Sequence, residues 1–514
     1  MPDATAMAVR DGIVAWIGRD DVGRDQFPDA EIIDLDGGFV APAFVDSHFH
    51  TTSTGLMLTG LDLRPAQSRR HCLQMVADFV GAHPEGVLWG HGWDETAWPE
   101  RDAPSTADLD ALVGDRLVYL TRIDVHSAAA SSALRARAGV TAADGQAPLR
   151  ADAHHRVRRA ARDALTAIQR DHARRAALDA AAACGIVAVH ECAGPEISGL
   201  DDWRELRDFD HGVEVVGYWG EAVNTADDAR DLLRGTRARG LAGDLFVDGA
   251  LGSHTAWLHD PYADVPTDCP NATGNSYLDV DAVAAHLGAC TEVGVTAGFH
   301  AIGDAAVTTV VSALARVAER CGAVALARCG HRLEHLEMVS EEQVAQLAGW
   351  GVIASVQPNF DALWGGENGM YAQRLGATRA RGLNPFALLA SRGVPLALGS
   401  DSPVTDLNPW SAIRAATNHQ SPGSAISARA AFAAATRGGW RAGGVRDGVS
   451  GMLVPGAPAS YAVWDAEEFD VAAPADAVAR WSTDPRSRVP ALPALHGRLP
   501  RCRQTVRQGV TIYG

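Results

Sequence analysis

Two histidines with one residue between them, His48 and His50, end an apolar run near the start of the chain, where residues 44–50 read FVDSHFH. Alternate side chains of a β-strand point to one face, so both imidazoles can reach one point from the end of one strand. Polar residues 51–54 follow, which is typical of a buried strand that opens into a site. Imidazole is the commonest protein ligand for metals, so the pair predicts half a metal site, although the spacing also arises by chance among 19 histidines.

The charge balance and the cysteines limit the class of protein. The 514 residues carry a net charge of −18, which disfavours nucleic acid and anionic membrane surfaces as partners. No stretch has the composition of a signal peptide or a membrane-spanning helix. The eight cysteines are scattered without a CxxC pair, as expected for reduced thiols. We expect a cytoplasmic protein with a small-molecule substrate, and a homodimer is an open alternative.

Strand-like runs alternate with Ala/Arg/Leu-rich helical stretches along most of the chain. Eight such units predict an α/β fold, a TIM (β/α)8 barrel, with its site at the carboxyl ends of the strands. The expected strands are Phe44–His48, Ile186–His190, Val213–Tyr218, Leu245–Asp248, Val295–His300, His331–His335, Val352–Gln357 and Pro395–Ser400.

Both ends of the chain carry short β-type runs, and each end is too small to bury a core alone. We therefore predict a small composite β-sandwich domain from residues 1–43 and 450–514, beside a barrel domain of residues 44–449. Its runs include Ile32–Leu35, Ser460–Trp464 and Val506–Tyr513.

The gap after the first strand, about residues 51–180, is too long for one helix. It holds an aromatic loop at residues 89–98 and an Ala/Arg-rich helix near residues 158–183. We expect an insertion at the carboxyl face of the barrel, where active sites lie.

Three more candidate ligands end predicted strands. His300 and His335 end the fifth and sixth strands, and Asp401 follows the eighth. A lone histidine at such a position is more often structural than a ligand. Four histidines and a carboxylate at one end of a barrel indicate a metal site instead.

Several distinctive motifs occur in order along nearly the whole chain. They are Asp46-Ser47-His48-Phe49-His50, Gly92-Trp93-Asp94-Glu95, Arg122…Asp124…His126, Asp248-Gly249-Ala250-Leu251-Gly252-Ser253, His300-Ala301-Ile302-Gly303-Asp304, Arg332-Leu333-Glu334-His335, Gln357-Pro358 and Gly399-Ser400-Asp401-Ser402-Pro403. With these motifs the chain resembles the amidohydrolase superfamily of metal-dependent hydrolases. Within it, the chain is similar to family 3, the branch that contains N-substituted formamide deformylase.

The resemblance implies a TIM barrel flanked by a composite β-sandwich, and it implies roles for the strand-end residues. Asp401 would be the general base, which takes a proton from metal-activated water and returns it to the leaving nitrogen. His335 would be either a ligand or a group that stabilises the oxyanion. The implied metal-site residues are His48, His50, His300, His335 and Asp401.

The chain departs from the family at the fourth strand. Many relatives carry a lysine four residues before the Asp-Gly pair, and its carbamylated form bridges two metals. This chain contains no lysine, and Asp244 stands at that position. Because Asp244 is several atoms shorter, we expect Asp248, nearer the strand end, to be the better substitute. We therefore favour one zinc ion, with a second, weaker site allowed; the expected ligands are His48, His50, His300 and Asp401.

Other motif residues have two interpretations each. Asp304 would orient a metal ligand or cap the helix that begins near Ala305. His126, Trp93 and Asp94 would line the pocket or pack within their loops. We expect Glu334 to be buried structure rather than a catalytic group.

The leading functional hypothesis is zinc-dependent hydrolysis of a non-peptide C–N bond in an amide, formamide or cyclic amide. A heterocycle deaminase using the same site is one alternative. A catalytically weak scaffold or binding protein with the same fold is another, and only the missing lysine supports it.

Overall fold

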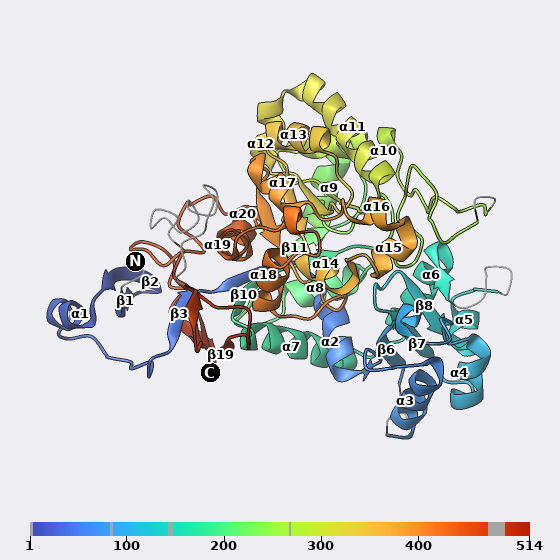
Figure 1. Cartoon of the computed structure of the whole chain (residues 1–514), viewed down its shortest axis with the longest axis horizontal. Coiled ribbons are helices and arrows are strands. Elements are labelled where there is room, and N and C mark those ends of the chain that lie inside the picture. The colour runs from blue at the N-terminus through green and yellow to red at the C-terminus, as the bar shows by residue number, and fades with distance from the viewer. Residues whose placement is uncertain (1–3, 83–85, 142–147, 267–268, 471–488) are drawn as a thin grey trace.

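The computed structural model describes residues 4–82, 86–141, 148–266, 269–470 and 489–514 (Figure 1). Seven parallel strands in two sheets form its centre, in the orders β11-β10-β4 and β12-β13-β14-β15. Most of their residues are buried, in agreement with apolar sequences that must face helices on one side and a core on the other. The strands are β4 (Phe44–Phe49), β10 (Ile186–Ala193), β11 (Glu214–Trp219), β12 (Gly298–Ala301), β13 (Arg332–His335), β14 (Ile353–Val356) and β15 (Leu396–Leu398).

Isolated parallel bridges join the two sheets. Phe49 bridges to Ser402, just after β15. On the other side, residues 240–246 bridge to Tyr218 of β11, to Ala297 just before β12 and to His300 of β12. The architecture is thus of the α/β, TIM-barrel type, with residues 240–246 between β11 and β12.

The predicted strand Leu245–Asp248 is wrong in one respect, because this segment makes isolated bridges and no regular ladder. Gly243 has a φ of +80°, a left-handed conformation that a regular strand does not contain. The resulting kink interrupts the pairing between Leu241 and Phe246.

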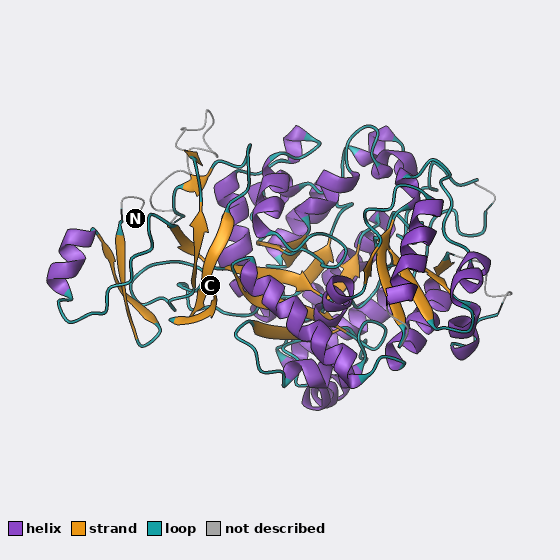
Figure 2. Ribbon diagram, turned by 90° about the horizontal axis from the view of Figure 1, so that it is seen from below, coloured by secondary structure: helices purple, strands orange, loops and turns teal. Residues whose placement is uncertain are grey.

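Helices surround the parallel strands (Figure 2). No helix in the described part of the chain is long and apolar enough to cross a membrane. The helices of this part are α8 (Leu200–Arg207), α9 (Ala226–Thr236), α10 (Val280–Val293), α11 (Asp304–Cys321), α12 (Ala323–Cys329), α13 (Glu341–Gly349), α14 (Pro358–Trp364), α15 (Met370–Leu375), α16 (Ala377–Ala380), α17 (Phe386–Ser391), α18 (Pro409–Thr417), α19 (Ala428–Ala433) and α20 (Gly439–Ala442).

Residues between β4 and β10 form a second sheet, in the order β5-β6-β7-β8-β9, with a core of its own. The single helix expected over residues 158–183 is two helices, because Thr166 starts the second one with a capping box that includes Gln169. The elements are α2 (Thr51–Thr59), β5 (Leu61–Asp62), α3 (Arg69–Ala82), β6 (Leu88–Trp93), α4 (Thr106–Val113), β7 (Val118–Arg122), β8 (Ser127–Ala130), α5 (Ser132–Arg137), β9 (Leu149–Arg150), α6 (Ala151–Asp163) and α7 (Ala167–Ala183).

The two ends of the chain share one antiparallel sheet, in the order β20-β19-β16-β3. Both views show the termini on the side of the molecule away from the β5–β9 sheet (Figures 1 and 2). Residues 471–488 of the expected composite domain lie outside the described residues. The elements are β1 (Ala6–Arg10), β2 (Ile13–Gly18), α1 (Asp20–Gln26), β3 (Phe39–Pro42), β16 (Tyr461–Asp465), β17 (Phe469–Asp470), β18 (Leu492–Pro493), β19 (Arg501–Arg507) and β20 (Val510–Tyr513).

The predicted strand Ile32–Leu35 is wrong. No strand in the described part of the chain pairs with this segment, and Ile32 and Ile33 are 59% and 69% exposed. Apolar β-branched residues alone do not make a strand when no partner strand lies beside them.

Candidate metal centre

The His48–His50 pair lies at the carboxyl end of β4, as its spacing predicts, and both rings are buried. The two ring centroids are 5.2 Å apart. Asp46, on the same strand, accepts hydrogen bonds from the backbone N–H groups of His48 and Ser400. This carboxylate therefore ties the histidine strand to the segment that leads into Asp401.

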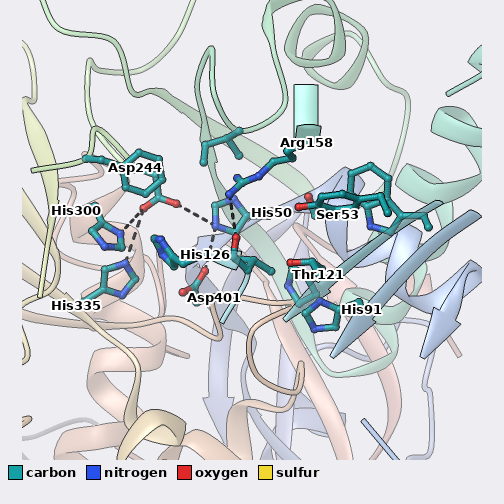
Figure 3. Close-up of a pocket in the computed structure, with 16 residues that line it drawn as sticks. His50, Ser53, His91, Thr121, His126, Arg158, Asp244, His300, His335 and Asp401 are labelled. Carbon is teal, nitrogen blue, oxygen red and sulfur yellow. Dashed lines mark hydrogen bonds and ion pairs between the residues drawn. The ribbon is translucent and has the colours of Figure 1, made fainter. Parts of the chain in front are cut away.

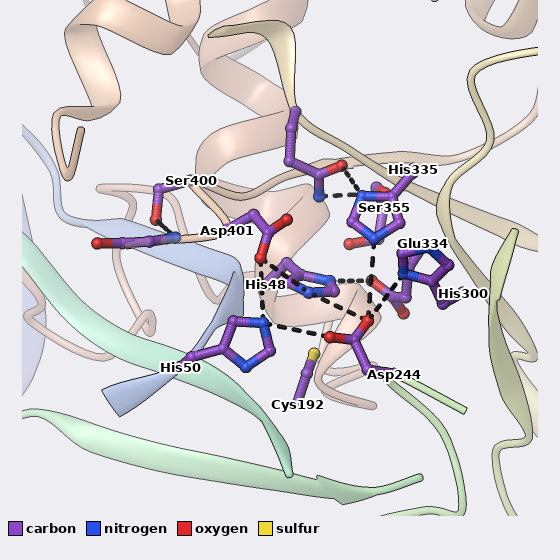
Figure 4. Close-up of polar contacts among 12 residues, drawn as sticks. His48, His50, Cys192, Asp244, His300, Glu334, His335, Ser355, Ser400 and Asp401 are labelled. Atoms are coloured by element: carbon purple, nitrogen blue, oxygen red, sulfur yellow. Dashed lines mark hydrogen bonds and ion pairs between the residues drawn. The ribbon is translucent and has the colours of Figure 1, made fainter. Parts of the chain in front are cut away.

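Four imidazoles from three strands converge on the carboxylate of Asp244 (Figure 4). Their nitrogen-to-oxygen distances to Asp244 are 3.2 Å from His50 Nε2, 3.4 Å from His300 Nδ1, 3.5 Å from His48 Nε2 and 3.8 Å from His335 Nε2. Asp401 closes the other side, with Oδ1 3.0 Å from His50 Nε2 and 3.4 Å from His48 Nε2.

Hydrogen bonds from behind orient three of the rings. His48 Nδ1–H donates to Glu334 Oε2 at 2.8 Å, and His335 Nδ1–H donates to Gln357 Oε1 at 2.8 Å. His300 Nε2–H donates to the Gly249 carbonyl at 3.2 Å. Each bond turns the opposite ring nitrogen toward the cluster, which is how metal-binding histidines are held.

The inward-facing atoms fit a cation. His48 Nε2, His300 Nδ1, His335 Nε2 and Asp244 Oδ1 are buried and have no hydrogen-bond partner. Burial alone lowers the pKa of His50, but hydrogen bonds to Asp244 and Asp401 raise it to about 9. The carboxylates of Asp244 and Asp401 thus favour positive charge at the cluster, and a divalent metal provides this charge while its ligands stay unprotonated.

Among the described residues, three groups of three bring possible ligand atoms within 4.8 Å of one another, and all three contain His48. The partners of His48 are His50 and Asp401 in one group, Asp244 and His335 in another, and Cys192 and Glu334 in the third. His335 and Asp401 have φ angles of 71° and 53°, unusual values for residues other than glycine. Such conformations concentrate at functional sites, where surrounding structure maintains them.

The expectation that Asp248 would replace the missing lysine is wrong. The Asp248 carboxylate accepts hydrogen bonds from three backbone N–H groups, at Trp257, Ile302 and Gly303. It braces the loop after β12 and comes no closer to His300 Nε2 than 4.0 Å. Asp244 reaches the cluster instead, because the kink at Gly243 takes its backbone off the regular strand path.

The other predicted residues lie in different surroundings. His126 lines the pocket, and its ring centroid is 5.2 Å from that of His300. Trp93 is fully buried and donates from Nε1 to the Leu120 carbonyl, and Asp94 caps a short helix and pairs with Arg122. Asp304 starts α11, and its carboxylate accepts from the His259 backbone N–H at 2.9 Å rather than from a ring of the cluster. Of these, only His126 reaches the site.

Glu334 is buried structure, as expected, and it also holds His48, a role that its alternation with Arg332 along a buried strand could have revealed. The sequence interpretation missed residues of the β5–β9 sheet and helix α6, which supply one wall of the pocket (Figure 3). The whole lining is His50, Ser53, Trp89, His91, Tyr119, Thr121, Val125, His126, Arg158, Ile197, Asp244, Phe246, His300, His335, Asp401 and Pro403.

Residues 31–513 match the sequence pattern of the amidohydrolase family. A putative amidohydrolase of Bacillus subtilis, YtcJ, is 27% identical over 454 residues, which cover 81% of this chain and 80% of that protein. The protein LONG AFTER FAR-RED 3 of Arabidopsis thaliana is also 27% identical, over 82% of this chain and 76% of its own length.

A solved structure of an uncharacterized metal-dependent hydrolase from Pyrococcus furiosus has a similar fold. Its TM-score is 0.68 at 26% identity, over 90% of this chain and 95% of that one. A counterpart from Pyrococcus horikoshii has a TM-score of 0.70 at 24% identity, over 90% and 93% of the two chains. The second likeness concerns the fold alone.

Proposed function

Because the chain belongs to the amidohydrolase family, as its motifs predicted, we propose that it is a metal-dependent hydrolase of a non-peptide carbon–nitrogen bond. The observation that carries this proposal is the set of buried ring nitrogens without hydrogen-bond partners that face Asp244 and Asp401. A merely structural cluster would satisfy these atoms within the protein, since unpaired buried polar atoms are costly.

We assign the favoured zinc ion to His48, His50 and Asp401, with Asp244 beside them. Imidazole and carboxylate ligands in a compact buried set suit zinc. This assignment moves His300 out of the first site, because its inward nitrogen lies beside Asp244 rather than Asp401. A second, weaker site would use His300 and His335 with the same Asp244 carboxylate.

A divalent metal bound here would polarise the amide carbonyl and make water a stronger acid. Asp401 acts as the general base: it takes the proton that the attacking water loses and delivers it to the leaving nitrogen. Amide plus water then becomes carboxylic acid plus amine. Inward-facing His335 either holds the metal or donates to the developing oxyanion.

For the substrate we propose an amide, formamide or cyclic amide with an apolar portion. The pocket wall opposite the cluster supports this, because Trp89, Tyr119 and Phe246 line it. Aromatic walls bind apolar groups through their large contact area.

Metal analysis and a substrate panel test the proposal. Protein purified without chelators should carry about one zinc ion per chain, and two tightly held metals would contradict the single-site assignment. A panel of N-formyl, N-acyl and cyclic amides, with aminated heterocycles for the deaminase alternative, should contain a substrate.

The Asp401→Asn substitution should reduce turnover of that substrate by about 10²- to 10⁴-fold without changing the far-ultraviolet circular dichroism. Asp304→Asn is the matched control, since Asp304 bonds only a backbone N–H away from the cluster, and it should keep the wild-type rate. Equal rates for wild type and Asp401→Asn would refute the assignment of the general base.

A further inference from the structure

Arg158, on helix α6, lines the same pocket as His50, Asp244 and Asp401. Only 8% of the residue is exposed. Figure 3 shows its guanidinium group on the side of the pocket where His50 and Ser53 lie. The metal cluster and this cation therefore face one common space.

Arg158 differs in its partners from four other buried arginines. Its Nη2 donates to the Val125 carbonyl at 2.9 Å and its Nη1 to the Glu196 carbonyl at 3.5 Å, while Nε has no partner. Among the described residues, no carboxylate lies within 4 Å of its nitrogens. Four other buried arginines each have a carboxylate partner, in the pairs Arg122–Asp124 at 2.7 Å, Arg174–Asp202 at 2.5 Å, Arg332–Glu334 at 2.9 Å and Arg374–Asp264 at 2.5 Å.

The groups around Arg158 do not neutralise its charge. Arginine stays protonated in proteins, and an unpaired buried charge is strongly unfavourable. Burial, together with the Arg158 charge, lowers the pKa of His155 to about 4 and holds that of His154 well below its usual value. These rings are neutral near pH 7, and Asp244 and Asp401 are engaged by the histidine cluster. The wall of the pocket thus presents a positive charge that lacks an anion.

We infer that the substrate carries a carboxylate, which Arg158 binds while the scissile amide lies at the metal cluster. The inference rests on the proposed hydrolase function and specifies its substrate class: amides with a carboxylate on the acyl or the amine portion, such as N-acylated amino acids. A planar guanidinium group binds a carboxylate through two parallel hydrogen bonds. Nη1 and Nη2 each carry a second N–H beside the one that bonds a backbone carbonyl, and these two are the donors for such a pair.

Matched substrate pairs test this inference. Each pair is an N-formyl or N-acetyl amino acid and its terminal carboxamide, which has the same shape without the charge. The zinc-loaded wild-type protein should hydrolyse the carboxylate members with the higher kcat/KM. Arg158→Met, which keeps an apolar stem in place of the charged one, should reduce the ratio of kcat/KM for the carboxylate to kcat/KM for the carboxamide by about 10- to 100-fold.

Two further variants separate binding from folding. Arg158→Lys keeps the charge, so it should recover part of the carboxylate preference, and it decides the matter if Arg158→Met fails to fold. Arg159→Met is the matched control on the same helix, because Arg159 is 47% exposed and pairs with Glu196. It should keep the wild-type preference.

A binding measurement is independent of turnover. The Kd values of a dicarboxylate series from malonate to adipate, and of their monoamides, are measured by calorimetry on zinc-loaded protein. One dicarboxylate should bind more weakly to Arg158→Met by about 10- to 100-fold. Inorganic phosphate is the other anion in the series: Arg158-dependent binding of phosphate alone overturns the carboxylate assignment.

The outcomes distinguish the two proposals. If neither member of any pair is hydrolysed although zinc is bound, the hydrolase proposal fails, and the binding series still decides whether Arg158 recognises carboxylates. If both members are hydrolysed equally by wild type and Arg158→Met, the hydrolase proposal stands and the carboxylate inference is overturned.

Discussion

Replacing Glu334 with glutamine tests whether the carboxylate behind His48 supports the metal centre. Glu334 Oε2 accepts from His48 Nδ1–H at 2.8 Å and from Arg332 Nη2 at 2.9 Å, and all three side chains are essentially unexposed. Glutamine has the same shape, but its single oxygen carries no charge. The substitution therefore weakens the orientation of His48 and leaves Arg332 without a buried anion.

The structure sets two magnitudes for Glu334→Gln. Removing one partner from a buried ion pair costs about 3–5 kcal/mol in the free energy of unfolding. Removing the partner that orients a metal-binding histidine weakens metal affinity by about 10- to 100-fold. Both effects should appear together, because one carboxylate serves both partners.

Zinc affinity is measured by competition with a chromophoric chelator, and stability by urea unfolding of metal-free protein. Glu341→Gln is the matched control, because Glu341 pairs with Arg392 on the surface, where the side chains are 66% and 48% exposed. It should change the free energy of unfolding by about 0–1 kcal/mol and leave zinc affinity unchanged. Wild-type zinc affinity in folded Glu334→Gln would refute the claim that this carboxylate orients a ligand.

Two further predictions concern the backbone and pH. Gly243→Ala should weaken zinc binding, because a Cβ there would meet Cys192 at 3.0 Å and disturb the kink that carries Asp244. Gly294 has a similar positive φ, and a Cβ there would meet nothing within 4 Å, so the control Gly294→Ala should lower stability alone. Zinc affinity is measured by chelator competition and stability by urea unfolding. His286 is fully buried, accepts from the Val223 N–H and donates to the Leu241 carbonyl, and burial lowers its pKa to about 4. Between about pH 4 and about pH 6.5 the unfolded chain therefore binds a proton at His286 that the folded chain does not. The free energy of unfolding thus falls as pH drops below about 6.5. Urea unfolding at about pH 5 and about pH 7 should show that His286→Gln removes about 2 kcal/mol of this pH dependence, and an unchanged dependence would contradict the assignment to His286.

The positions of the histidines could be predicted because strand geometry fixes them. His48 and His50 share a strand face, and His300 and His335 end neighbouring parallel strands, so the fold alone brings them together. The sequence pattern contains this information directly: an apolar run marks each strand, and the residue at its end lies at the site.

The pocket wall could not be predicted in the same way. Arg158 lies on a helix of the segment between β4 and β10, and the helical spacing of its apolar residues marks a buried face without showing that this face borders a pocket. Trp93 and Asp94 belong to a distinctive motif, yet Trp93 packs in the core of the β5–β9 sheet and Asp94 pairs with Arg122. A motif identifies the family, but only the tertiary packing decides which of its side chains face the pocket.

Asp244 shows why a rule based on side-chain length failed where strand geometry succeeded. Comparing aspartate with a carbamylated lysine assumes that both start from the same backbone position. Here Gly243 kinks the chain, and the Asp244 backbone lies directly against Gly220, just after β11, where an added Cβ would meet it at 2.7 Å. The carboxylate thereby comes within 3.2–3.8 Å of four imidazoles without a long side chain. The broken fourth strand thus compensates for the missing lysine, because the shape of the backbone brings the short Asp244 side chain to the imidazoles.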